Sequence, residues 1–198
     1  MKNKNILIIL LSLFVSFNTD AQTLTASLRV SADYNKTYLL VEDLFSITNI
    51  APFESIWGYR AGLSLNTKLY KSLSLDSELG YSRGGFDGHN KAYRKNIDQI
   101  YISVAPEYEV LKFIKLKAGL LLNYNIKNND WLAKDVEPFN YALTTGISAN
   151  YKSFELGVRY THYLNPYFSY KKRSEIFDNG FEYWNTTSIF LGFKFWKH

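Results

Sequence analysis

Polar and apolar residues alternate strictly over residues 23–34, where the sequence reads TLTASLRVSADY. Leu24, Leu28 and Val30 belong to the apolar series, while Arg29 and Asp33 belong to the polar one. A period of two is the pattern of a β-strand whose two faces meet different surroundings. The segment is longer than the usual soluble strand of about 5–6 residues. The apolar face therefore lies either inside a soluble barrel or against lipid.

The same alternation occurs in seven further segments, over residues 57–69, 73–81, 100–108, 114–124, 141–151, 154–164 and 187–195. Eight is an even number of strands and the smallest size among bacterial outer-membrane barrels. No Asp, Glu, Lys or Arg falls in the apolar series of any segment. This matters in lipid, where an Arg or Lys at the midplane costs about 2–4 kcal/mol. The pattern predicts an all-β fold: an eight-stranded antiparallel up-and-down transmembrane β-barrel.

The lengths of the connections between these segments support the membrane alternative. Short joins fall near residues 70–72, 110–112 and 152–153, and they alternate with long ones over residues 35–54, 84–96, 126–138 and 166–182. Outer-membrane barrels have short periplasmic turns and long external loops. Aromatic residues also gather where the apolar series end, which predicts two interfacial girdles. A secreted lipocalin-like barrel is the alternative fold.

The N-terminal segment has the composition of an export signal. Lys2 and Lys4 precede an apolar core from Ile6 to Phe17, and Thr19 and Ala21 fit a small-residue cleavage site. The apolar core is too short for a spanning helix of about 20 residues. We therefore expect a signal peptide over residues 1–21, a barrel domain over residues 22–198 and location in the bacterial outer membrane. A retained anchor helix is the alternative.

Several stretches resemble the small outer-membrane β-barrel family of Bacteroidetes that includes PorT-like proteins. They are LSLDSELGYSRGGF at residues 73–86, the hairpin IYISVAPEYEVLKFIKLKAGLLLNYN at 100–125, FELGVRYTHYLN at 154–165 and SIFLGFKFW at 188–196. The resemblance covers nearly the whole chain after the signal peptide, and it implies an outer-membrane location. For some members of that family it implies a part in secretion, so a secretion-associated subunit is one alternative function.

The charges of the polar series would lie inside the barrel. An eight-stranded barrel is only wide enough for side chains to fill, and a buried charge is stable when it is paired and hydrogen-bonded. We expect a plugged polar lumen, with a narrow pore as the alternative. Pro106, in the fourth segment, lacks a ladder donor and predicts a β-bulge. The candidate interior network consists of Arg29, Arg60, Asp76, Glu78, Glu107, Lys115, Lys117, Glu155 and Arg159.

The first long connection is unusually apolar for a hydrated segment. Leu39, Leu40, Leu44 and Phe45 predict either a lid over the barrel mouth or a surface that binds an envelope protein. Lysine and arginine clusters in two other long connections are candidates for contact with lipopolysaccharide phosphates. Outer-membrane lipid, including lipopolysaccharide, and an envelope protein are therefore the expected partners. Nucleic acid is not expected for an exported barrel.

One enzymatic alternative comes from the seventh segment. His162 and Asn165 resemble part of the His-x-Ser-Asn arrangement of outer-membrane lipid A deacylases, but Leu164 stands where those enzymes have the nucleophilic serine. The chain has 3 His and no Cys, and no metal-ligand spacing is present. Its net charge of +5 is too mild to indicate a partner. We therefore expect no enzyme activity, no cofactor and a structural or adaptor role.

Overall fold

The computed structural model describes residues 23–43, 46–50, 53–88, 95–126, 137–166, 168–174 and 177–197. Side chains are described for residues 23–36, 55–85, 96–126, 137–166 and 185–197. The expected signal peptide over residues 1–21 lies outside the described residues, so the domain limits stay predictions. Within the described part of the chain, no helix is long and apolar enough to cross a membrane.

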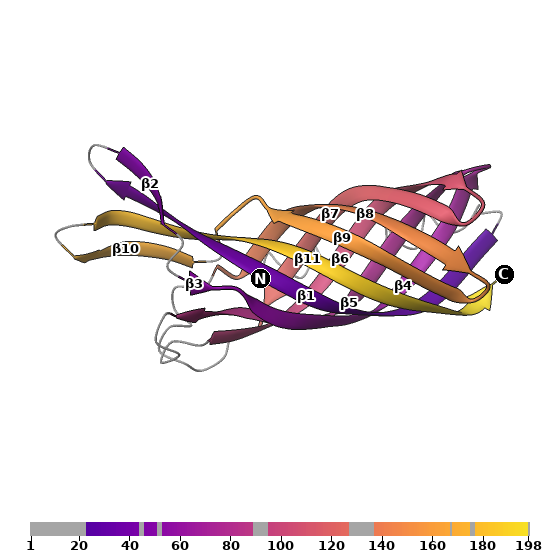
Figure 1. Ribbon diagram of the computed structural model, residues 1–198, viewed down its shortest axis with the longest axis horizontal. Helices are drawn as coiled ribbons and strands as arrows, with labels where there is room; N and C mark the ends of the chain where they lie inside the picture. Colours follow the sequence, from indigo (N-terminus) through magenta and orange to yellow (C-terminus); the bar gives the residue numbers. More distant parts are fainter. Residues whose placement is uncertain are drawn as a thin grey trace, which may run out of the picture.

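Eight antiparallel strands close into a barrel (Figure 1). Each strand pairs with the next along the chain, and pairing of β11 with β1 closes the ring. This confirms the predicted eight-stranded up-and-down topology. The strands are β1 (Thr23–Asp43), β4 (Ile56–Tyr70), β5 (Leu73–Gly88), β6 (Lys95–Leu111), β7 (Ile114–Asn125), β8 (Phe139–Tyr151), β9 (Phe154–Tyr163) and β11 (Phe177–Lys197).

Tight turns join the strands at one end of the barrel, which we call the turn end. Residues 71–72 join β4 to β5, residues 112–113 join β6 to β7, and residues 152–153 join β8 to β9. The second turn lies later than expected, since Val110 and Leu111 still belong to β6. Lys152 has a φ of 51°, in the left-handed region that tight hairpins use. The first residue of β1 and the last of β11 also lie at this end, because Thr25 pairs with Lys197.

Two segments predicted as loops contain strands. β1 continues to Asp43 and stays paired with β11 as far as Glu42 opposite Asn179. β2 (Ser46–Ile50) pairs with β1, and β10 (Phe168–Ser174) pairs with β11, so a sheet in the order β2-β1-β11-β10 extends beyond the barrel (Figure 1). We call it the outer ribbon. Backbone pairing needs no alternating side chains, which explains why the hydrophobic pattern did not predict these strands.

This arrangement corrects the prediction for the first long connection. Leu39 and Leu40 belong to strand β1, whereas Leu44 and Phe45 lie outside the described residues. A short strand, β3 (Phe53–Glu54), follows β2 and pairs with the far end of β5. The ribbon projects along the long axis, away from the barrel (Figure 1), which is not the position of a lid.

The bulge predicted at Pro106 is absent. Pro106 lies opposite Leu75 in an unshifted ladder with β5. On the β7 side, Val104 pairs with Leu120 and Glu107 pairs with Lys117, so the register is the same before and after the proline. The missing N–H is thus accommodated by a local gap in pairing with β7 rather than by an inserted residue.

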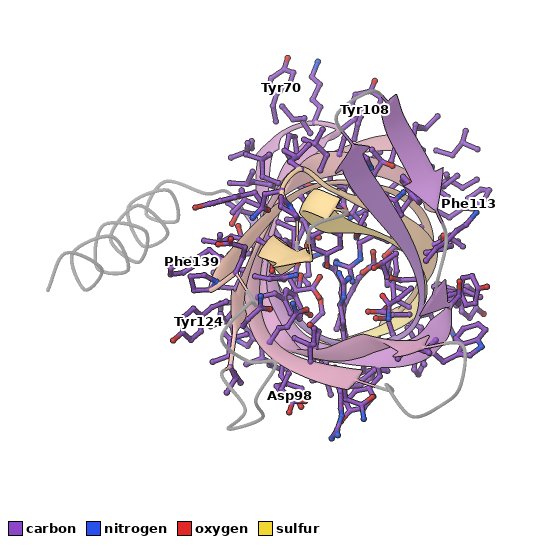
Figure 2. All side chains as sticks on the ribbon, turned by 90° about the vertical axis from the view of Figure 1, so that its left-hand side faces the viewer. Tyr70, Asp98, Tyr108, Phe113, Tyr124 and Phe139 are labelled. Carbon is purple, nitrogen blue, oxygen red and sulfur yellow. The ribbon has the colours of Figure 1, made fainter. Side chains whose placement is uncertain are left out.

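The barrel is apolar outside and polar inside (Figure 2). Outward-facing Leu63 and Leu120 are 59% and 62% exposed, whereas inward-facing Glu78 and Glu155 are each 2% exposed. A soluble barrel would bury its leucines and expose its carboxylates. The lipocalin-like alternative is therefore wrong, and the outer wall has the character of a lipid-facing surface.

Aromatic side chains ring both ends of this wall. Tyr124 and Phe139 pack together at the end opposite the turns, with their ring centroids 5.3 Å apart. Tyr70, Tyr108 and Phe113 lie on the outer surface at the turn end (Figure 2). Tyrosine suits this position because its ring is apolar and its hydroxyl is polar. These two girdles of aromatic residues mark the levels at which the barrel would meet the two membrane–water interfaces.

Candidate functional site in the lumen

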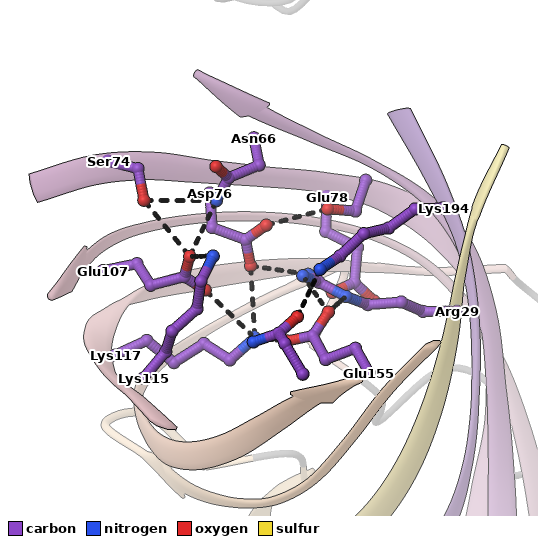
Figure 3. Close-up of polar contacts among 12 residues, drawn as sticks. Arg29, Asn66, Ser74, Asp76, Glu78, Glu107, Lys115, Lys117, Glu155 and Lys194 are labelled. Atoms are coloured by element: carbon purple, nitrogen blue, oxygen red, sulfur yellow. Dashed lines mark hydrogen bonds and ion pairs between the residues drawn. The ribbon is translucent and has the colours of Figure 1, made fainter. Parts of the chain in front are cut away.

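The side chain of Arg29, on β1, extends into the lumen and contacts three carboxylates there (Figure 3). Its Nη1 lies 2.5 Å from Oδ2 of Asp76 and 3.2 Å from Oε2 of Glu78, both on β5. Its Nη2 lies 2.8 Å from Oε2 of Glu155 on β9, and its Nε donates to the same oxygen. All four side chains are almost wholly buried. One guanidinium therefore neutralises parts of three carboxylates, which its rigid fork of donors allows.

Lys117 of β7 approaches the same carboxylates from the opposite wall. Going round the ring from β1 through β4, β5 and β6, β7 is the strand diametrically across from β1. The Nζ of Lys117 lies 3.4 Å from Oδ2 of Asp76 and 3.3 Å from Oε1 of Glu155. Because Arg29 binds both of these residues too, the ionic network spans the full width of the lumen (Figure 3).

Glu78 also binds a second arginine and a tyrosine. Nη1 of Arg159 lies 3.2 Å from Oε2 of Glu78, and the Tyr101 hydroxyl donates to Oε1 of the same residue at 2.5 Å. Arg60 forms a separate pair with Asp33, in which Nε lies 2.6 Å from Oδ2. Glu78 is thus bound by two cations and a hydroxyl, which offsets the cost of burying its charge.

Toward the turn end, Glu107 of β6 is the acceptor for a further group. Lys115 places its Nζ 2.5 Å from Oε1 of Glu107. The same oxygen accepts from the Asn66 amide at 2.9 Å and from the Ser74 hydroxyl at 3.1 Å. Together with the central contacts, the structure brings all nine residues of the candidate network into ion pairs on the inner wall.

Two interior aromatic rings that sequence reasoning passed over line this network. Tyr101 lies beside Gly80 and Gly62, which are adjacent in register across β5 and β4. A Cβ on Gly80 would stand 2.8 Å from Cζ of Tyr101, so only glycine leaves room for the ring. The guanidinium of Arg60 lies 5.7 Å from the centre of that ring, within cation–π range.

Phe190 repeats the arrangement on β11. It lies opposite Gly157 of β9, where a Cβ would stand 2.5 Å from the ring. The Nζ of Lys117 lies 4.6 Å from the ring centre, and the guanidinium of Arg159 lies 5.5 Å from it. Alternation already placed Phe190 between Ile189 and Leu191, on the polar series. That position was the available signal that this phenylalanine lies inside.

An uncharged layer lies above the ionic one, toward the loops. Gln99 donates to Asn125 at 2.6 Å, and Asn125 donates to Asn140 at 2.6 Å. Asn123 donates to the hydroxyl of Tyr163 at 2.9 Å. Amides both donate and accept, so they satisfy one another without a net charge. The ion pairs around Arg29 and Glu107 thus lie on the turn side of these amides, whereas the Arg60–Asp33 pair lies nearer the loops.

The candidate lipid-hydrolase residues do not meet in a recorded contact. Nδ1 of His162 lies 2.7 Å from Oδ1 of Asn185, on the exposed outer surface. Asn165 instead donates to the backbone oxygen of Phe139 at 2.8 Å and accepts from the backbone N–H of Tyr141 at 2.7 Å. Asn165 thus caps the end of β8. No group of three or more His, Asp or Glu side chains suited to a metal occurs in the described residues.

No protein-family model matches the chain, and no curated protein sequence matches it. Among solved structures, the chain is similar to the outer membrane protein OprG from Pseudomonas aeruginosa, with a TM-score of 0.51 and 10% identity over 88% of this chain and 96% of that one. It is also similar to Neisserial surface protein A, with a TM-score of 0.48 and 13% identity over 86% and 97% of the two chains. Ail, the attachment invasion locus protein of Yersinia pestis, gives a TM-score of 0.43 and 9% identity over 87% and 98%.

The fold is that of a small bacterial outer-membrane barrel. The likeness to OprG is one of fold. The outer surface of this chain gives a physical reason to place it in a membrane. A wall of exposed leucines and valines around a closed ladder is stable in hydrocarbon, where every backbone group must find its partner within the protein. The protein therefore lies in a bacterial outer membrane.

Proposed function

We propose that this protein is an interaction barrel, without enzymatic activity, that acts through the outer ribbon. The observation that carries the proposal is the β1–β11 ladder, which runs without interruption from the barrel wall out to Glu42 opposite Asn179. A loop that only connects two strands does not need a continuous ladder of this kind. A sheet anchored in the wall holds its outer residues at a fixed position above the membrane.

The edges of the ribbon suit it to binding a protein. In the described residues, β2 pairs only with β1 and β10 pairs only with β11, so each leaves one edge of the sheet open. An open edge presents unpaired N–H and C=O groups, which can accept an extended strand from a partner. The proposed partner is an envelope protein, and the segment with Leu39, Leu40, Leu44 and Phe45 is the candidate contact.

Affinity purification after mild cross-linking in native membranes tests this role. One variant replaces residues 39–50 with an Asn-Gly turn, and a matched control replaces residues 169–180 in the same way. Loss of a cross-linked envelope protein in the first variant, with retention in the second, supports the candidate segment. Recovery of the same proteins from the wild type and both variants rejects the ribbon as the interaction surface.

The filled lumen favours a closed barrel over the narrow-pore alternative. Arg29 and Lys117 reach the same carboxylates from opposite walls, so an ion crossing the barrel would have to displace paired charges. We expect no single-channel steps when the purified protein is inserted into a planar lipid bilayer. Reproducible steps that disappear on removal of the protein would support the pore instead.

The remaining alternatives rest on less. PorT-like membership, and with it a secretion-associated role, is supported by the sequence resemblance and by the agreement in architecture. A lipid A deacylase role has only His162 and Asn165 in its favour, and these residues bond to different partners. The mass of lipid A should therefore stay unchanged when the protein is expressed. Lipopolysaccharide is the proposed lipid neighbour of the outer half of the wall.

A further inference from the structure

The lumen opens at the turn end into a cavity of about 400 Å³. Arg29 and Glu155 of the ionic network form part of its lining, and Ser27, Lys115 and Lys194 also face it. A second hollow of about 140 Å³ adjoins it and shares Lys115 with it. The larger volume lies within the range of about 300–1,000 Å³ that is typical of small-molecule sites. The site of interest is thus a concave space on the turn-end side of the network.

A β-bulge turns an additional lysine into this space. Ala26 lies opposite Trp196, yet Ser27 lies opposite Lys194, so the ladder skips one residue of β11. Beyond the bulge, Lys197 lies opposite Thr25 and lines both hollows. Side chains three residues apart on a regular strand point to opposite faces. The bulge instead brings Lys194 and Lys197 to the same cavity, which is a known use of bulges near binding sites.

Positive charge exceeds negative charge in this space. Of the acidic residues that line the two hollows, Glu155 is already bound by Arg29 and Lys117, which leaves Glu109. The lining lysines are Lys68, Lys71, Lys115, Lys152, Lys194 and Lys197. Several cations in a concave, low-dielectric space focus a positive potential that attracts anions.

Lys115 is already paired with Glu107, whereas Lys194 and Lys197 are poorly matched within the described part of the protein. Lys194 donates to the amide oxygen of Asn150, and no carboxylate in the described part of the chain lies within ion-pair distance of Lys194 or Lys197. Ser27 is 2% exposed, and it lines the same cavity. Ammonium and hydroxyl groups of this kind satisfy an oxyanion.

We propose that this cavity binds a small soluble oxyanion of the periplasm, of the phosphate or phosphate-ester class. Lys115 and Lys194 are its principal contacts, and Lys197 and the Ser27 hydroxyl supply further donors. A phosphate group carries close to two negative charges and three acceptor oxygens, which matches several lysines and a hydroxyl. The opening faces the turn end, which in outer-membrane barrels lies toward the periplasm, so the ligand enters from the periplasm. The proposal is independent of the outer ribbon.

Titration of inorganic pyrophosphate tests the proposal, with the barrel held in micelles of an uncharged detergent. Trp196 lines the cavity and provides a fluorescence signal, and calorimetry gives a second readout. We expect saturable binding in the wild type. Combining Lys115→Gln with Lys194→Gln removes two charge-assisted contacts and should weaken binding at least about tenfold. Lys112→Gln is the matched control, because this exposed turn lysine lines neither hollow.

Single variants guard against a folding defect. Lys194→Gln breaks no ion pair of the described residues, so the barrel should keep its circular dichroism spectrum and still lose affinity. Lys194→Arg keeps the positive charge and should retain most of the affinity for pyrophosphate. Absence of saturable binding in the wild type, or equal affinity in the double variant, overturns the proposal. So does binding confined to vesicles of anionic phospholipid that depends on Lys71 and Lys152, since those rim lysines would then serve lipid headgroups.

Discussion

The inner and outer walls of the barrel are built from the same strands, yet they follow opposite rules. On β7, Leu120 is 62% exposed toward lipid, while its neighbour Leu121 is 2% exposed in the lumen. Outside, single side chains contribute by being apolar, and the chemical identity of each matters little. Inside, Arg29 contacts three carboxylates, and each contact depends on the others. On the outer wall, substitution of one apolar residue by another should therefore be tolerated. On the inner wall, a substitution should be tolerated only if it preserves the contacts with the residue's own partners.

The largest expected effect is at the inner wall. Arg29→Met leaves Asp76, Glu78 and Glu155 short of their shared cation. Removing one partner of a buried ion pair costs about 3–5 kcal/mol, so the free energy of unfolding should fall by that amount. Urea-induced unfolding in phospholipid vesicles measures it. Adding Asp76→Asn and Glu155→Gln removes the uncompensated charges and should restore much of the loss. A single variant as stable as the wild type would contradict the network's importance.

Introducing a charge on the outer wall should lower the free energy of unfolding somewhat less than the loss of Arg29. Leu120 lies halfway along β7 and faces lipid, so Leu120→Lys should reduce the free energy of unfolding by about 2–4 kcal/mol. Tyr70→Lys, at the end of β4, is the matched control and should cost only about 0–1 kcal/mol because it lies at the interface. The same vesicle assay compares the two. Equal costs at both positions would mean that the apolar wall does not face a bilayer.

The glycine–aromatic contacts on the inner wall should give an intermediate effect. Gly157→Ala places a Cβ 2.5 Å from the ring of Phe190 and should cost about 1–3 kcal/mol through overpacking. Gly192→Ala is the control, because its Cβ would lie 3.2 Å from Oε2 of Glu155, a longer contact than the 2.5 Å at Gly157. Thermal unfolding followed by circular dichroism should rank Gly157→Ala as the less stable variant. The reverse order would reject the packing role of Phe190.

The smallest effect is expected at the rim of the turn end. Lys71 lies 5.5 Å from the ring centre of Tyr70, and Lys152 lies 5.5 Å from that of Tyr151. Exposed cation–π pairs contribute about 0.5–1 kcal/mol, so Lys71→Ala and Lys152→Ala should each destabilise by no more than this. The two variants serve as controls for each other in urea unfolding. A loss several times larger at either site would assign it a structural role absent from the present contacts.

The alternation of side chains was sufficient to predict the barrel. Seven of the eight predicted segments lie within a strand, and the segment at 154–164 runs past the end of β9 by one residue, Leu164. Period two with an uncharged face has few other stable solutions in a membrane. The same period assigned Arg29, Glu78 and Glu155 to one face. It could not say which carboxylate each cation meets, since Arg29 and Glu155 are 126 residues apart. Those pairings follow from barrel closure.

Three features were decided only by the folded chain. Strands β2 and β10 pair outside the membrane, where no lipid imposes an alternating pattern. Pro106 lies in an unshifted register because the loss of one N–H is met by a gap in pairing and needs no inserted residue. The bulge beside Ser27 reverses the face of Lys197, which period two would have placed outside. The sequence by itself determined the number of strands in the barrel and which side chains share a face, because both depend on side-chain alternation, and the lengths of its connections favoured the membrane barrel. Partner choice, bulges and the lysine-lined cavity depend on strand register, which only the closed tertiary structure determines.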